Sequence, residues 1–234
     1  MSHPNVLVIL SGCGVFDGSE FHESVITLLH LDRHDAKVTF AALDVDQMHV
    51  VDHHVGQPTE GKRNIRTESA RIARGPVQDL AEVHGDAFDA VIFPGGFGAA
   101  KNLCSFATLG HQCEVNPEVA RVLREAHEAG RPIGLICISP TIGARVFPGC
   151  TVTIGCDPAT ADAIKKMGSH HQARHTNEVC VDETHRIVST PAYMSAKRIG
   201  QVYEGIGALV DRVMRMIDEP VHSLAHSGAA GHRH

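Results

Sequence analysis

Cys137 stands between a short apolar run, Ile133 to Ile136, and the pair Ser139 and Pro140. The run follows Gly130 and is rich in β-branched residues, which predicts a short buried strand. Serine and proline are typical of the first turn of a helix, so the chain must turn sharply from strand to helix at Cys137. Such a nucleophile elbow would expose the thiol at the carboxyl end of the strand and point a helix amino terminus at it. We therefore expect a lowered thiol pKa and a nucleophilic thiolate.

A second interpretation of Cys137 stays open from this stretch alone. Free cysteine is among the most buried residue types, so the residue is equally consistent with a small hydrophobic side chain that ends a core strand. The two interpretations differ in whether the sulfur can be reached by small molecules and whether an acidic side chain lies beside it.

A glycine-rich turn, Pro94 to Gly98, follows another predicted strand that ends at Phe93. Only glycine-rich sequence makes such a turn, and consecutive glycines leave backbone amides free. The amides of Gly95, Gly96 and Ile138 are candidates to bind an oxyanion or a hemithioacetal oxygen, since preorganised backbone donors stabilise developing negative charge. A tight turn with no binding role is the alternative.

Two carboxylates, Glu20 and Glu23, stand at the start of the first predicted helix. Asp17 and Glu20 have the spacing of a capping box, which gives Glu20 a competing role. Either Glu20 or Glu23 is a candidate to exchange protons with Cys137, because a partly buried carboxyl has a raised pKa suited to that task. Helical periodicity places Glu23 opposite the main apolar face, which by pattern alone favours a solvated charge. Which carboxylate faces the sulfur stays open.

Strands alternate with helices along the chain, which predicts an α/β fold with a mostly parallel sheet and helices on both faces. Strands are expected at 5–10, 37–42, 88–93, 133–136 and 151–154, with a strand pair within 178–189. Helices are expected from the capping box to about residue 33, at 116–130, after Ser139, at 158–167 and at 193–217. A polar excursion from 44 to 75 is expected to hold a hairpin and a short helix at 68–73.

The first predicted helix has apolar residues at Phe21, Val25, Leu28 and Leu29, a spacing that predicts the face packed on the sheet. Ligands of such folds gather at the carboxyl edge of the sheet. The loops expected to meet there are 11–23, 94–101 and 137–140.

The chain has 234 residues, and we expect a single α/β domain over 1–219 followed by a mobile, histidine-rich tail over 220–234. A formal net charge of -6 without lysine or arginine blocks argues against a nucleic-acid or membrane partner. The seven cysteines form an odd set with no C-x-x-C pair and no preceding signal peptide, which predicts a reducing cytoplasm. None of the eighteen histidines has the spacing of a zinc site, so no metal is expected.

Four parts of the chain carry motifs that are specific when taken together: Ile9 to Val15 with Asp17 to Glu20, Phe93 to Leu103, Ile136 to Pro140, and Thr190 to Met194. They resemble the ElbB family, isoprenoid biosynthesis proteins with amidotransferase-like domains that include glyoxalases. The resemblance covers essentially residues 5–218 and implies the class I glutamine amidotransferase-like fold, a flavodoxin-like sandwich shared with the PfpI proteases and the parkinsonism-associated deglycase, usually as a homodimer. It places the elbow cysteine on Cys137, its acid on Glu23 and the glycine turn on Gly95 and Gly96.

The chain also departs from its superfamily. Glutaminases of this fold need a histidine and a glutamate from a later loop, where this chain has Thr190 to Tyr193. PfpI proteases place histidine directly after the nucleophile, where this chain has Ile138, and the parkinsonism-related proteins carry a histidine where this chain has Thr153 to Cys156. A Cys/Glu dyad is what remains.

The resemblance therefore implies a cofactor-free, glyoxalase-like lyase that acts on a small dicarbonyl, methylglyoxal or glyoxal. The Cys137 thiolate would add to the aldehyde, Glu23 would move a proton between the adjacent carbons, and water would release the hydroxy acid. The residues themselves motivate only a dyad that attacks small carbonyl compounds. The alternative is a non-enzymatic or redox-responsive protein of the same fold that has lost the ancestral triad.

Overall fold

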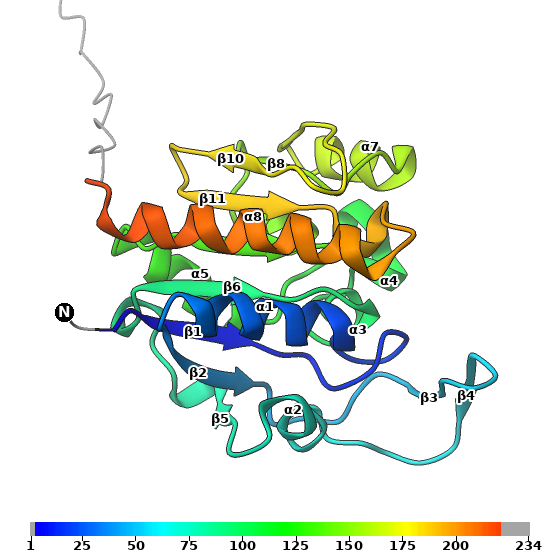
Figure 1. The fold of residues 1–234 in the computed structure, drawn as a ribbon. Coiled ribbons are helices and arrows are strands. Elements are labelled where there is room, and N and C mark those ends of the chain that lie inside the picture. Colours follow the sequence, from blue (N-terminus) through cyan, green and yellow to red (C-terminus); the bar gives the residue numbers. More distant parts are fainter. Residues whose placement is uncertain (1–2, 221–234) are drawn as a thin grey trace, which may run out of the picture.

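A seven-stranded sheet forms the centre of the computed structural model, which describes residues 3–220 (Figure 1). The strand order is β10-β11-β7-β6-β1-β2-β5, and every neighbouring pair is parallel except β10 with β11. The strands are β1 (Asn5–Ile9), β2 (Lys37–Ala42), β5 (Gln78–Asp79), β6 (Ala90–Phe93), β7 (Ile133–Ile136), β10 (Cys180–Asp182) and β11 (Ile187–Thr190). The predicted α/β fold with a mostly parallel sheet is confirmed.

Helices cover both faces of this sheet, as Figure 1 shows. Helices α1 (Phe21–Arg33) and α8 (Ile199–Asp218) lie against one face, while α5 (Pro117–Glu128) and α6 (Pro140–Val146) lie against the other. In β1, Val6 and Val8 pack into the first layer, and Leu7 and Ile9 pack into the second. A strand buried on both faces has no polar side to show, which is why the central strands are almost wholly apolar.

The remaining elements extend the two edges of the sheet. They are α2 (Ile65–Ala73), α3 (Phe97–Lys101), α4 (Phe106–Leu109), α7 (Pro158–Lys166), the hairpin β3 (Val50–Asp52) and β4 (Gln57–Thr59), the pair β8 (Thr151–Val152) and β9 (His170–His171), and the 3-10 helices η1 (Leu80–Glu82), η2 (Gly85–Ala87), η3 (Gly110–Gln112) and η4 (Ala192–Met194). The predicted hairpin and short helix of the polar excursion are both present.

Two elements have boundaries in the structure that differ from the predicted ones. The strand expected at 151–154 is only β8, and it pairs with β9 outside the main sheet. It stops because side chains take over its backbone amides: Thr153 N donates to Ser189 Oγ at 2.9 Å and Ile154 N to His171 Nε2 at 3.4 Å. The last helix was expected to begin at Tyr193, but η4 intervenes and α8 begins at Ile199.

Helix α1 packs through a different face from the one its apolar residues predicted. Phe21, Val25 and Leu29 are 49%, 42% and 41% exposed, so this prediction is wrong. The buried residues are Glu23, Ser24, Ile26, Thr27, His30 and Leu31. Their polar groups have partners: the hydroxyls of Ser24 and Thr27 donate to carbonyls one turn back, each at 2.7 Å. Internal hydrogen bonds remove most of the cost of burying a polar face.

The predicted homodimer stays a prediction.

The loops expected at the carboxyl edge do meet there, and backbone hydrogen bonds join them. Glu20 N donates to Gly95 O, and Gly98 N donates to Gly18 O, each at 2.9 Å. The predicted capping box is wrong, because Glu20 itself is the N-cap of α1 and accepts from Glu23 N at 2.7 Å. Asp17 instead accepts from Val51 N at 2.8 Å, which ties the first loop to the β3–β4 excursion.

The predicted histidine-rich tail, 220–234, lies outside the described residues apart from Pro220. Within residues 3–220, no helix has both the length and the apolar character needed to cross a bilayer. The last described helix, α8, packs on α1, where a Cβ on Gly207 would lie 2.6 Å from the His30 ring, and on the segment before β10 that contains Thr176.

Two glycines of α8 provide a matched test of this packing. A Cβ on Gly205 would lie 2.0 Å from the backbone oxygen of Thr176, whereas a Cβ on Gly200 would meet nothing within 4 Å. Gly205→Ala should therefore lower the free energy of unfolding by about 1–3 kcal/mol through overpacking. Gly200→Ala should leave it unchanged or raise it by up to about 1 kcal/mol, because alanine favours helix. Urea unfolding followed by circular dichroism measures both, and equal shifts in the two variants would contradict this packing.

Candidate active site

Cys137 occupies the sharp turn between β7 and α6. Its φ of 64° lies in the left-handed region that side-chain-bearing residues rarely adopt. Its amide donates to Thr190 O at 2.9 Å, and the next turn is pinned because Ser139 Oγ donates to Pro94 O at 2.8 Å. The elbow geometry expected from the sequence is therefore present. Cys137 is buried, with 7% of its surface exposed, so the expectation that the elbow exposes the thiol is wrong.

Glu23, in the first turn of α1, lies beside the Cys137 thiol. Its Oε2 accepts from Gly95 N at 3.0 Å and its Oε1 accepts from Tyr193 N at 3.2 Å. The carboxyl and the thiol lie close together, because a Cβ on Gly95 would be 2.6 Å from Glu23 Oε2 and 3.0 Å from Cys137 Sγ. Glu23 is 0% exposed, so the interpretation of this residue as a solvated charge is wrong. Of the two candidate carboxylates, the structure therefore brings Glu23 to the sulfur, whereas Glu20 caps the helix.

The glycine turn is close-packed against this pair. A Cβ on Gly95 would lie 2.3 Å from Cys137 Cβ and 2.6 Å from Glu23 Oε2, so a larger residue would displace the pair. The Gly95 amide is taken by the Glu23 carboxyl and is not free for an oxyanion. The amides of Gly96 and Ile138 are near enough to the sulfur to lower the pKa of the thiol. Of the three predicted donors, these two remain beside the reacting atom.

Burial dominates the electrostatics of the pair. Burial and, after it, the nearby Glu20 carboxylate together raise the pKa of Glu23 to about 8, although the Tyr193 and Gly95 amides oppose the shift. Burial also raises the pKa of the Cys137 thiol well above its usual range, and the negative charge of Glu23 is the second cause of this rise. The amides of Gly96 and Ile138 lower the thiol pKa but do not offset these effects. The lowered thiol pKa expected from the helix amino terminus is therefore wrong, because desolvation outweighs the helix dipole here.

Two further polar residues, His22 and Tyr193, lie at the rim of this site and were not among the predicted site residues. His22 Nδ1 is 2.8 Å from Tyr193 Oη and 4.0 Å from Glu20 Oε1. The tyrosine backbone holds Glu23, so this stretch provides an amide where glutaminases need a histidine. The sequence signals were the position of His22 between Glu20 and Glu23 and the motif Thr190 to Met194, which contains the tyrosine; neither shows that the two side chains meet.

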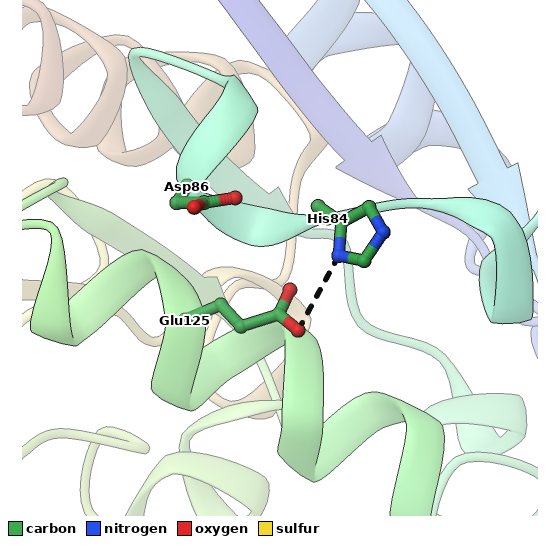
Figure 2. Close-up of side chains that lie close together, drawn as sticks. All are labelled: His84, Asp86 and Glu125. Atoms are coloured by element: carbon green, nitrogen blue, oxygen red, sulfur yellow. Dashed lines mark ion pairs between the residues drawn. The ribbon is translucent and has the colours of Figure 1, made fainter.

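A separate group of metal-ligand-type side chains lies at the other end of the sheet. Figure 2 shows His84, Asp86 and Glu125, whose ligand atoms lie within 4.8 Å of one another. Glu125 Oε1 already accepts from Arg121 Nη1 at 2.8 Å, and its Oε2 accepts from Gly85 N at 2.8 Å. A metal ion here would have to compete with an arginine for the carboxylate. His84 and Asp86 precede β6, and Glu125 lies near the end of α5, before β7. The group is therefore at the amino ends of these strands, away from the thiol that follows the carboxyl end of β7.

The chain is similar to proteins from several organisms. A human protein, "Glutamine amidotransferase-like class 1 domain-containing protein 3, mitochondrial", is 49% identical over 221 residues, which cover 90% of this chain and 82% of the human protein. "ES1 protein, mitochondrial" of Danio rerio is 39% identical over 231 residues, which cover 91% of this chain and 86% of the fish protein. The crystal structure of an isoprenoid biosynthesis protein with amidotransferase-like domain from Ehrlichia chaffeensis has a TM-score of 0.85 and 38% identity, covering 92% of this chain and 99% of that chain.

These relatives overturn one prediction. The human, rat and zebrafish proteins are all named mitochondrial, so the predicted cytoplasmic location is wrong. Cysteine usage indicates only that a compartment is reducing and does not distinguish one reducing compartment from another.

The model of the DJ-1/PfpI family matches residues 13–197, a span that runs from the first loop past the glycine turn and the elbow to η4. The family contains enzymes, including proteases and glyoxalases. The match therefore includes the segments that hold Cys137, Glu23 and their amide donors. On this evidence the chain belongs to the DJ-1/PfpI family.

Proposed function

We propose that this protein is a glyoxalase-like enzyme of the ElbB group that converts methylglyoxal or glyoxal to the corresponding hydroxy acid through a covalent adduct on Cys137. The observation that carries the proposal is the buried pair of Cys137 and Glu23, with the amides of Gly96 and Ile138 beside the sulfur. The likeness to an amidotransferase-like protein at 38% identity supports the assignment to the ElbB group.

The geometry supports a general-base route rather than a preformed thiolate. Glu23 as carboxylate accepts the thiol proton while the sulfur forms a bond to the aldehyde carbon, and the carbonyl π pair moves to oxygen. That oxygen is then placed near the Gly96 and Ile138 amides. Glu23 then returns the proton to that oxygen and is again a carboxylate. The product of this step is a hemithioacetal, which carries a hydroxyl on the first carbon and keeps the carbonyl on the second.

Isomerisation and hydrolysis complete the reaction. Glu23 takes the hydrogen of the first carbon as a proton and returns it to the second carbon, while the hydroxyl proton of the first carbon moves to the oxygen of the second. The ketone thereby becomes an alcohol and the hemithioacetal becomes a thioester. Water then adds to the thioester carbonyl, the C–S bond breaks, and the thiol regains a proton. Methylglyoxal plus water gives lactic acid in this scheme, and no external oxidant or reductant is consumed.

The close packing around Cys137 favours small substrates. Cys137 is 7% exposed, and the turn beside it has no space for a side chain at Gly95. A three-carbon dicarbonyl needs less room beside the sulfur than a peptide does. The raised thiol pKa also argues against the redox-responsive alternative, because ready oxidation follows thiolate character and exposure.

The dyad is tested by substitution with a matched control. Cys137→Ser should abolish lactate formation from methylglyoxal, and Glu23→Gln should lower kcat/KM by about 10²–10⁴-fold, since a general base is lost. Cys156→Ser should change nothing, because that cysteine is exposed and has, among the described residues, no carboxyl partner of the kind that Glu23 provides to the buried Cys137. Lactate is measured by an enzymatic assay or by NMR. Full activity in Cys137→Ser, or no product from the unsubstituted protein, would sink the proposal.

EDTA should leave the rate of lactate formation unchanged, since no step of the scheme involves a metal. The measurement is the same lactate assay after dialysis against the chelator. Loss of turnover that zinc or nickel restores would instead assign the activity to a metal site.

The raised pKa of Glu23 predicts a pH dependence. The carboxyl accepts the thiol proton only when ionised, so alkylation of Cys137 by iodoacetamide should rise with pH and level off above about 8. Glu20→Gln should move this step to lower pH, because the charge of Glu20 is the second cause of the raised pKa. Mass spectrometry of the Cys137 peptide follows the rate. A step at the same pH in Glu23→Gln would show that another group titrates.

A further inference from the structure

The proposed reaction needs a proton donor that the Cys137–Glu23 pair does not provide. When Glu23 removes the hydrogen of the first carbon, negative charge develops on the oxygen of the second carbon. The Gly96 and Ile138 amides lie beside the sulfur, and in the proposed scheme they donate to the oxygen of the first carbon. The Gly95 and Tyr193 amides are already taken by Glu23. A second side chain must therefore donate to the second oxygen if the enediol is to form quickly.

The Tyr193 hydroxyl meets the requirements of that donor. Its backbone amide is 3.2 Å from Glu23 Oε1, so the residue is attached directly to the proposed base. Burial raises the pKa of the Tyr193 hydroxyl, and the charges of Glu20 and Glu23 raise it further. The phenol therefore lies in the field of both carboxylates and keeps its proton at neutral pH. The residue is also only partly buried, whereas Glu23 beside it is fully buried.

His22 holds this hydroxyl in place. Its Nδ1 lies 2.8 Å from Tyr193 Oη, and the two rings are 5.9 Å apart between centroids. The same nitrogen is 4.0 Å from Glu20 Oε1, so Glu20, His22 and Tyr193 form a continuous polar line across the rim. Half of the His22 side chain is exposed, which connects this line to solvent.

We propose that Tyr193 is a catalytic residue that binds the second carbonyl oxygen of the dicarbonyl adduct on Cys137, and that His22 is its positioning residue. This inference rests on the glyoxalase-like function proposed above. As Glu23 takes the proton from the first carbon, the C–H electron pair forms the C=C bond, and the carbonyl π pair takes a proton from Tyr193 Oη. When the thioester forms, the hydroxyl proton of the first carbon is released and restores the tyrosine. The site then selects compounds with two adjacent carbonyl groups over simple aldehydes.

The chain contains two tyrosines, which provides a matched control for the test. Tyr193→Phe keeps the ring and the backbone amide that holds Glu23 but removes the hydroxyl. It should lower kcat for lactate formation by about a hundredfold. The rate at which iodoacetamide alkylates Cys137, and its protection by methylglyoxal, should stay within about twofold of the unsubstituted protein. Tyr203→Phe, on α8 next to Arg33, should change neither quantity.

His22 is tested by rescue with a conservative substitution. His22→Ala should lower kcat, and His22→Gln should restore part of it, because a glutamine can still bond to the Tyr193 hydroxyl. Unchanged kcat in Tyr193→Phe would overturn the inference while leaving the glyoxalase proposal intact. Equal losses of kcat and of Cys137 alkylation would also overturn it, since they would show a merely structural role. No lactate from the unsubstituted protein would instead refute the function on which the inference rests.

Discussion

The burial of the Glu23 carboxyl is the interaction on which the site depends. A carboxyl that is 0% exposed is costly to desolvate, and the cost is reduced only because each oxygen accepts a backbone amide, one from Gly95 and one from Tyr193. The third partner is the Cys137 thiol. Four separate segments, namely the start of α1, the glycine turn, the elbow and η4, are therefore held together by one side chain.

That burial also determines which chemistry the thiol can do. At an exposed elbow, a helix amino terminus would favour thiolate. Here desolvation raises the pKa of both partners, so the pair is neutral or singly charged near neutral pH and the proton must move between them as the sulfur reacts. The carboxyl becomes the base for the thiol, and its position beside the adduct allows the same group to act on carbon.

Glycine makes this close approach possible at two adjacent positions for different reasons. Gly95 leaves room for the sulfur and the carboxyl. Gly96 has a φ of 99°, which favours glycine, and a Cβ there would lie 2.4 Å from both Glu20 N and Gly18 O. The first loop is fastened in turn by Asn102, whose Nδ2 donates to Ser11 O and Asp17 O at 2.9 Å. The second carboxyl-edge loop thus supports the first, and both enclose the thiol.

The sequence alone was sufficient for the features that local chain geometry determines. The apolar run before Cys137 and the serine and proline after it predicted the strand, the elbow and the helix, and alternating strands and helices predicted the sheet. These patterns reflect backbone preferences within a few residues of each other. Family resemblance, rather than periodicity, favoured Glu23 over Glu20 as the acid.

Only the tertiary structure decided which side of α1 is buried and which groups meet across the chain. An amphipathic helix with apolar residues on one stripe and satisfied polar residues on another can pack through either, and here contact with α8 buries the stripe that contains Glu23 and His30. The pairing of His22 with Tyr193 joins residues 171 positions apart, and no local pattern encodes it. The pKa values also follow from burial, which is a property of the assembled fold and not of any short segment.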